Sequence, residues 1–269
     1  SPTVAGGAAL MRQYFEQGFH PRGQRRAGDR LRPLAATMKA ALMNSTLELV
    51  NTFLGITQLP SLSTGWGRMY LERDLYFPGD DRLLRVYERE HATGLATGEV
   101  HDYPLAHVGA GEPLRVTLAW MDPAGVLGAE FPLVNDLDLE LVAPNGDIYY
   151  GNALRDPGCL ALTCYRPAPP DPCMLPACDP ILRLESIANL DDRDRIHSVE
   201  AIRILAPQAG AYVLRVRGFS VPGNDRVGSD RQGYGLVVAA AFATPPSTPI
   251  AAPTHLSVVQ NDLAGIRIG

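Results

Sequence analysis

The stretch that decides the fold reads Asp136-Leu137-Asp138-Leu139-Glu140-Leu141, in which acidic residues and leucines alternate strictly. Successive side chains of a β-strand point to opposite faces, so this period of two predicts a strand with one apolar and one acidic face. Segments 114–120, 212–217 and 234–238 alternate in the same way. We therefore expect two sets of side chains. The inward set is Trp120, Leu137, Leu139, Leu141, Tyr212, Leu214 and Val216, and the set facing outward or towards a loop site is Asp136, Asp138, Arg215 and Arg217.

Turn-forming residues separate these segments. Gly109-Ala110-Gly111, Pro144-Asn145-Gly146-Asp147 and Pro207-Gln208-Ala209-Gly210 each lie between two alternating runs. Proline, glycine and Asx residues supply the backbone conformations that tight turns need. Half-buried strands with such turns between them are typical of an antiparallel β-sandwich, which we place at about 80–244.

The N-terminal region has helical periodicity instead. Apolar residues recur at helical spacing from 4 to 15, and the small residues at 5–9 predict a helix that is buried on most sides. An Arg/Gly segment interrupts the pattern at 20–32. A second helix is expected from Pro33 to about Asn44.

The composition excludes two classes of partner. The 269 residues carry a net charge of −5, which gives no basic surface for nucleic acid. No apolar run approaches the roughly 20 residues that a membrane span needs. The chain is long enough for one or two domains with a real core.

The opening segment carries a resemblance to a known family. It reads Ser1-Pro2-Thr3-Val4-Ala5-Gly6-Gly7-Ala8-Ala9-Leu10 and resembles the stretch just after the catalytic serine of subtilisin-like serine peptidases, the subtilases, whose signature is G-T-S-x-x-[ST]-P-x-V-A-G. Later segments resemble the family's late helix, the G-x-G-R-x end of its catalytic domain, and the C-terminal sandwich of one subtilase subgroup. In order, these segments are 39–43, 65–69, 133–139 with 143–146 and 150–152, 198–200 and 206–212.

The resemblance implies a mixed fold. Residues 1–78 would be the helical C-terminal remnant of an α/β subtilisin-like catalytic domain, and 80–244 an antiparallel, jelly-roll-like β-sandwich. It implies a secreted, extracellular serine endopeptidase as the parent, with protein or peptide substrates. The family's Asp, His and nucleophilic Ser would all precede Ser1, so this chain should be inactive and hold no catalytic residue.

The sequence argues against a catalytic role for two groups of residues, the His101–Asp102 pair and Ser1. His101 and Asp102 are adjacent on an expected strand, so their side chains should diverge. Ser1 precedes a proline at the start of a helix, where serine normally caps. The alternative function is a non-catalytic extracellular sandwich that binds carbohydrate or protein. Trp120 is in phase with the core positions, which argues against its use as a sugar platform.

The chain after the sandwich is expected to contain a linker and part of another module. Prolines are dense at 245–254, which predicts a stiff extended linker. Residues 255–269 alternate again and resemble the first strands of a fibronectin type III module.

All four cysteines are confined to one expected insertion, at 155–195, within the sandwich. Structural zinc sites favour C-x2-C pairs, whereas both pairs here have four residues between the cysteines. An even count in a chain that resembles secreted peptidases favours two local disulfides, with connectivity left open. The four residues are Cys159, Cys164, Cys173 and Cys178.

A calcium site is the remaining candidate. Carboxylates of Asp136, Asp138 and Glu140 on one strand face repel each other unless they are solvated, paired with arginine or bridged by a hard cation. Subtilases often bind calcium, so the resemblance makes Asp136 and Asp138 candidate calcium ligands, although the residues themselves favour the other reading. The alternative is an outward polar face opposite Arg215 and Arg217.

Overall fold

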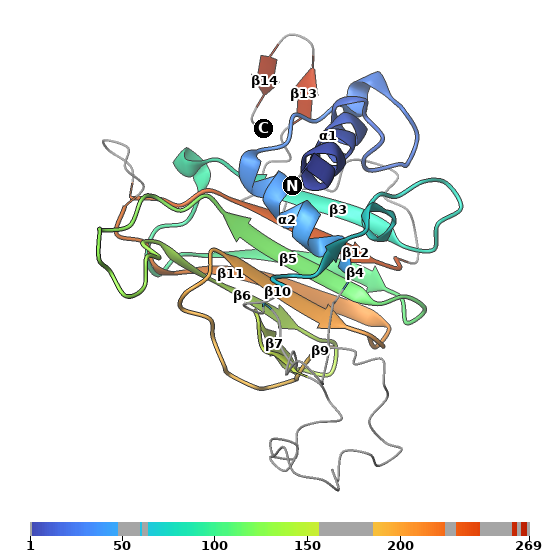
Figure 1. Cartoon of the computed structure of the whole chain (residues 1–269). Coiled ribbons are helices and arrows are strands. Elements are labelled where there is room, and N and C mark those ends of the chain that lie inside the picture. The colour runs from blue at the N-terminus through green and yellow to red at the C-terminus, as the bar shows by residue number, and fades with distance from the viewer. Residues whose placement is uncertain are drawn as a thin grey trace, which may run out of the picture.

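Two antiparallel four-stranded sheets pack face to face, and two helices lie at one side of them (Figure 1). The structure, a computed structural model, describes residues 2–47, 60, 64–155, 185–223, 230–242, 260–262 and 265–267. The four cysteines and the whole proline-rich linker at 245–254 lie outside these residues. The mainly antiparallel architecture agrees with the predicted β-sandwich, while the domain boundaries at 78–80 and 244 stay predictions.

The first sheet has the strand order β10-β5-β12-β3, and the second has the order β4-β11-β6-β7. In the first sheet the bounds are Val199–Ile204 (β10), Leu114–Trp120 (β5), Tyr234–Ala240 (β12) and Leu83–Arg89 (β3). In the second they are Val100–Val108 (β4), Gly210–Ser220 (β11), Asp136–Val142 (β6) and Ile148–Tyr150 (β7).

Short elements complete the described chain. Three two-stranded ladders pair β1 (Thr46–Leu47) with β2 (Arg68–Met69), β8 (Leu154–Arg155) with β9 (Glu185–Ser186), and β13 (Gln260–Asp262) with β14 (Gly265–Arg267). The 3-10 turns are η1 (Ala27–Asp29), η3 (Leu71–Arg73) and η4 (His91–Thr93). None of the helices within the described residues is long and apolar enough to cross a membrane.

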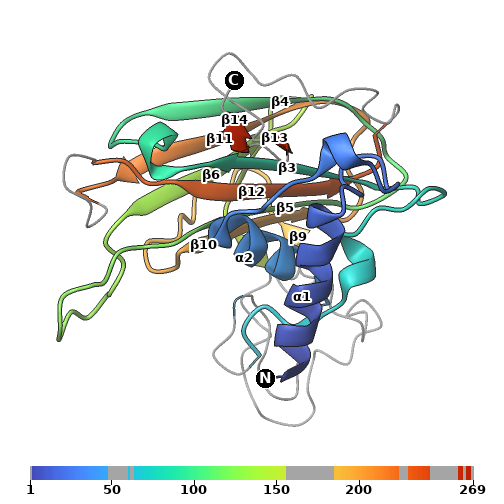
Figure 2. The ribbon, with the colours of Figure 1, turned by 90° about the horizontal axis from the view of Figure 1, so that it is seen from above.

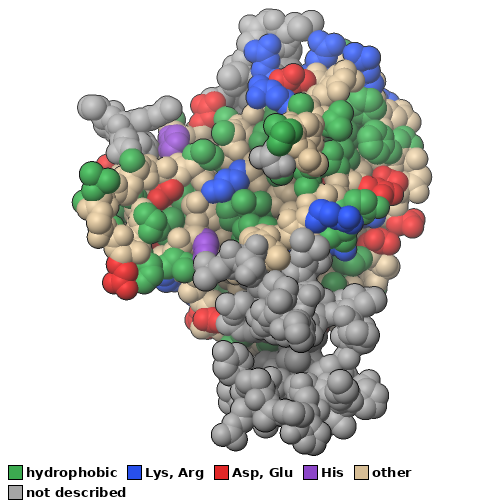
Figure 3. All heavy atoms as spheres, viewed as in Figure 1, with side chains coloured by type: hydrophobic (Ala, Val, Ile, Leu, Met, Phe, Trp, Pro, Cys, Tyr) green, Lys and Arg blue, Asp and Glu red, His purple; other side chains and the backbone are tan. Residues whose placement is uncertain are grey.

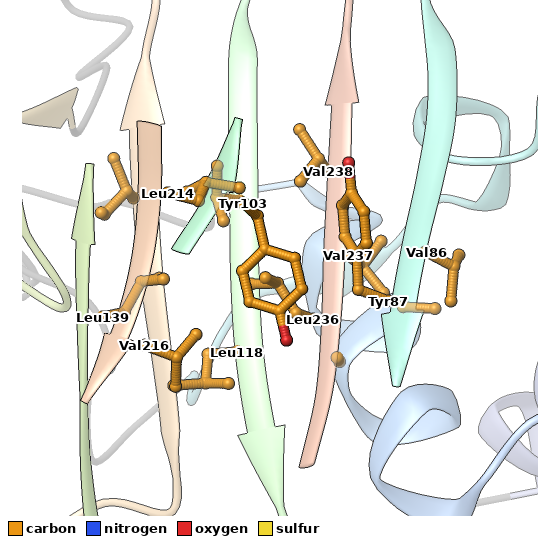
Figure 4. Packing of buried hydrophobic residues seen from close by; sticks show 14 of the residues in the cluster. Val86, Tyr87, Tyr103, Leu118, Leu139, Leu214, Val216, Leu236, Val237 and Val238 are labelled. Carbon is orange, nitrogen blue, oxygen red and sulfur yellow. The ribbon is translucent and has the colours of Figure 1, made fainter. Parts of the chain in front are cut away.

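The space between the sheets holds the predicted inward set. Every member of that set is at most 2% exposed. Figure 4 shows Val216 of β11 next to Leu118 of β5 from the opposite sheet, and Leu214 further along β11 belongs to the same core cluster. The predicted register of both β6 and β11 is therefore confirmed, because a slip of one residue would have exchanged the two faces.

The helices α1 (Pro2–Glu16) and α2 (Ala35–Asn44) occupy the predicted places. The expectation that the first helix is buried on most sides is wrong. Only one stripe of α1 is buried, while Val4 and Leu10 are 49% and 59% exposed. The small residues indicated room for close packing; of the two glycines among them, Gly7 is in close contact with the side chain of Met69, whereas Gly6 has no described neighbour within 4 Å.

Helix α2 lies on the outer face of the first sheet, across β5 and β12 (Figure 2). Gly235 of β12 allows this approach, because a Cβ at that position would lie 2.4 Å from Cα and N of Thr37. The helix begins at Ala35, not at Pro33, and its capping position, Leu34, contributes no side-chain hydrogen bond. The cap comes from the sheet instead: Glu88 of β3 accepts hydrogen bonds from Leu34 N at 3.1 Å and Thr37 Oγ1 at 2.5 Å.

Two more polar links fasten α2 at its far end and side. The guanidinium of Arg115 donates from Nε and Nη2 to the carbonyl oxygen of Asn44 at 3.0 and 2.9 Å. Lys39 Nζ donates to the carbonyl oxygens of Trp120 and Ser198 and to Ser198 Oγ at 3.3, 3.2 and 2.8 Å. Charged donors and acceptors make the stronger hydrogen bonds, so the helix is fixed in place as well as packed.

On the face drawn in Figure 3, acidic and basic side chains are interspersed among hydrophobic ones.

Candidate functional site

The acidic row of β6 faces away from the core, as predicted, yet it is buried. Asp136, Asp138 and Glu140 are 8%, 2% and 4% exposed. Their neighbours on β11 include Arg217, opposite Asp138, and Arg215, opposite Glu140. The expected polar face opposite these arginines is therefore present, and a second layer covers it.

That second layer comes from the loop before β10. Arg193 Nη1 lies 2.8 Å from Asp138 Oδ2 and 2.9 Å from Glu140 Oε1. Arg195 Nη1 lies 2.9 Å from Asp136 Oδ2 and 2.6 Å from Asp138 Oδ1. Each oxygen of Asp138 thus accepts from a different arginine. The arginines replace the solvation that the buried carboxylates have lost.

Glu200 is a further member of this acidic site that the sequence reading did not select. One carboxylate oxygen from each of Asp136, Asp138 and Glu200 lies within 4.8 Å of the others. Glu200 Oε2 accepts a hydrogen bond from Leu139 N at 2.6 Å. Burial raises the pKa of Glu200 well above its ordinary value, and the neighbouring aspartates add to the shift. Burial also raises the pKa of Asp136, and Arg195 opposes that change.

Asp194 and Asn152 fix the rim of the site. Asp194 Oδ1 accepts from the backbone nitrogens of Ile196 and His197 at 2.8 and 3.0 Å. Its Oδ2 lies 2.6 Å from both Asn152 Nδ2 and His197 Nδ1. Asn152 in turn bonds the backbone of β10 through Val199 O and Ala201 N, at 2.7 and 2.8 Å. The loop that carries both covering arginines is thereby held against β10.

The donor set suits a hard divalent cation in part. Calcium prefers six to eight oxygen ligands, and three converging carboxylates provide the right atoms. Asp136 Oδ1 is buried and, within the described part of the chain, has no hydrogen-bond partner. Both oxygens of Asp138, however, already accept from Arg193 and Arg195. A calcium ion and the two arginines would therefore compete for Asp138.

The hydrogen bonds of His101 and Ser198 give these side chains a structural role. His101 Nδ1 lies 2.7 Å from the Tyr234 hydroxyl, whereas Asp102 pairs with Arg215 on the other face, so the predicted divergence of His101 and Asp102 is confirmed. Ser198 Oγ accepts from Lys39, whose ammonium also donates to two carbonyl oxygens. Burial lowers the pKa of Lys39. Three oxygen acceptors nevertheless stabilise its charged form, which cannot act as a base towards Ser198. Trp120 is fully buried and offers no sugar platform.

Comparison with known proteins adds relatives at a distance. No protein-family model matches the chain. The chain is 33% identical over 158 residues to the serine protease/ABC transporter B family protein tagA of Dictyostelium discoideum, covering 54% of this chain and 8% of the relative. It is 27% identical over 191 residues to the family protein tagD of the same organism, covering 57% of this chain and 10% of that relative.

These relatives show that part of the chain is similar to proteins whose names include serine proteases. The chain spans about a tenth of the length of the curated relatives it matches. Their names describe whole proteins that are far longer than this chain.

Proposed function

We propose that this chain is part of a secreted serine endopeptidase of the subtilisin type. Residues 1–78 would form the C-terminal end of its catalytic domain, and the sandwich would support that end. The ordered sequence landmarks from Ser1 to 212 favour the subtilisin type, and the relatives named as serine proteases favour a peptidase. In such a parent, a serine attacks the peptide carbonyl, a histidine acts as general base, and an aspartate orients the histidine.

The docking of α2 carries the proposed support role. The helix is capped by Glu88, tied by Arg115 and packed against Gly235, all of which belong to the first sheet. A helix held by three separate strands cannot shift without breaking several charged hydrogen bonds. The sandwich would thus hold the last helix of the catalytic domain in a fixed position.

The inactivity of this chain is tested with an active-site probe. We expect no labelling of the purified chain by a fluorophosphonate and no hydrolysis of a casein substrate, because the nucleophile and base would lie upstream of Ser1. Labelling of any serine in this chain, with peptidase activity that the probe abolishes, would refute the proposal. Activity of a longer chain that includes the upstream region, and its loss on substitution of the upstream serine, would support it.

Calcium at Asp136, Asp138 and Glu200 is the second proposal for this chain. The specific observation in its favour is the buried, unpartnered Oδ1 of Asp136. Calcium should raise the Tm of the chain more than magnesium does, and Asp138→Asn should abolish the difference. Equal effects of the two ions on the unsubstituted chain would exclude a specific site.

We also propose an extracellular location with two disulfides in the insertion at 155–195. The four cysteines lie outside the described residues, so the argument rests on their even number, their confinement to one insertion and the peptidase resemblance.

A further inference from the structure

The space between the two sheets contains an ionised side chain without a counter-ion. Arg89 is the last residue of β3, its Cα partner across the ladder is Tyr234 of β12, and it is 5% exposed. Tyr87, two residues earlier on the same face, contacts Tyr103 of the opposite sheet, with ring centroids 4.8 Å apart. Arg89 therefore points into the interior of the sandwich.

One edge of the Arg89 guanidinium is unused. Its Nε and Nη2 are both buried, and neither has a hydrogen-bond partner among the residues that the structure describes. These two nitrogens form the fork with which arginine binds a carboxylate through two parallel hydrogen bonds. Arg215 shows that use in the same sheet system, where its Nε and Nη2 donate to the two oxygens of Asp102 at 2.8 and 3.2 Å. Arg89 has the same pair of nitrogens on one edge of its guanidinium.

No described carboxylate is available to fill that fork. Among the residues that the structure describes, none forms an ion pair with Arg89. Glu88 points to the other side of β3, where it caps α2. Glu99 is engaged by Arg231, whose Nη2 lies 2.6 Å away.

The neighbouring hydroxyls do not supply a negative charge either. Tyr103 and Tyr234 share a short hydrogen bond, and burial raises the pKa of both, although the charge of Arg89 and its hydrogen bonding to the two hydroxyls oppose the shift. Both phenols are therefore neutral near pH 7, whereas a guanidinium stays charged at any accessible pH. Neutral hydroxyls do not balance the charge of Arg89, and a buried charge without a counter-charge is costly, which favours the binding of an anion at this position.

We propose that the Nε–Nη2 edge of Arg89 binds a small monovalent oxyanion, such as a carboxylate or nitrate, between the two sheets. The two nitrogens match a planar pair of oxygens, which favours an oxyanion over a spherical halide. Arg89 is 5% exposed and lies beside Tyr103 and Tyr234, so the ligand is an ion of a few atoms and not a side chain of a second protein. The inference is independent of any peptidase activity.

The test measures the thermal stability of the purified chain at constant ionic strength while sodium fluoride is replaced by sodium formate. A ligand that binds only the folded state raises Tm with the logarithm of its concentration. We expect formate and nitrate to raise Tm and chloride to do so less. Arg89→Met should weaken formate binding by roughly tenfold or more, since charged hydrogen bonds are lost.

Two matched variants complete the experiment. Arg215→Met, which removes a fork that is already filled by Asp102, should keep the formate response of the unsubstituted chain. Arg89→Lys keeps the charge without the fork, so it should lose the preference for formate over chloride. If Arg89→Met does not fold, 13C-formate line broadening by the unsubstituted chain, reversed by nitrate, gives the same decision. The proposal is overturned by an unchanged formate response in Arg89→Met, by an equal response to chloride, or by the absence of line broadening.

Discussion

Replacing Gly235 with alanine should displace α2 from the sheet on which it lies. The added Cβ would lie 2.4 Å from Cα and N of Thr37 and 2.7 Å from the carbonyl carbon of Ala36. These are backbone atoms, so no side-chain rotation relieves the contact. The helix must move by roughly 1 Å to restore ordinary van der Waals distances.

The magnitude follows from two contributions. Overpacking of a well-filled interface costs about 1–3 kcal/mol. The same displacement stretches the bond from Thr37 Oγ1 to Glu88, and weakening a buried hydrogen bond to a charged group adds about 1 kcal/mol. We expect the free energy of unfolding to fall by about 2–4 kcal/mol, a large part of the stability of an ordinary domain.

Urea unfolding, followed by tryptophan fluorescence, measures this loss. Gly111→Ala is the matched control, because a Cβ there has no neighbour within 4 Å. Limited proteolysis of Gly235→Ala should cut within 35–44 faster than in the control. A change of less than about 0.5 kcal/mol, with unaltered cleavage of the helix, would show that α2 does not rest on β12 as described.

Three further predictions concern charge and covalent links. Burial raises the pKa of Asp74 from 3.8 to about 7, so the folded state binds the proton of this carboxyl more tightly than the unfolded state does. The free energy of unfolding should therefore fall as the pH rises from about 4 to about 7, and Asp74 contributes at most about 1.4 kcal/mol per pH unit to that fall. Asp74→Asn should remove that slope in a series of Tm measurements against pH, and an identical slope would contradict the assignment. Arg195→Met should lower the free energy of unfolding, measured in urea, by about 1–2 kcal/mol; the loss is smaller than for a fully buried pair because the Arg195 side chain is 34% exposed. The control is Arg12→Met, in the exposed pair with Glu16, which should lower it by less than about 0.5 kcal/mol. A thiol reagent applied to the denatured, non-reduced chain should find no free cysteine, and four reactive thiols would refute the disulfides.

The strands and their faces could be predicted because one simple rule governs them. A period of two along β6 and β11 fixes which side chains enter the core, and Leu139 and Val216 are buried as that rule requires. The opposition of Asp138 to Arg217 also follows from strand alternation and pairing. Strand alternation could also have identified Glu200, which the sequence analysis did not select: it lies in phase with the buried residues Ile202 and Ile204 of β10.

The other parts of the site depend on contacts that alternation does not encode. Arg193 and Arg195 belong to a loop without period, so only the folded chain brings them over Asp138. The exposure of Leu10 could not be predicted for a similar reason. Apolar spacing on α1 shows which side chains share a face of the helix, but it does not show whether another element packs against that face.

Because the cap of α2 is the carboxylate of Glu88 on β3, this helix depends on parts of the chain that are synthesised after it. The helix leaves the ribosome before Glu88, and about two hundred residues before Gly235, on which it rests. Ten residues without a cap of their own do not hold a helix in water, so the segment emerges as an unstructured apolar stretch. It acquires its structure only when the last strand of the first sheet is made. Until β12 is made, the apolar side chains of 35–44 lack the sheet that covers them in the folded chain, and exposed apolar surface of this kind favours aggregation.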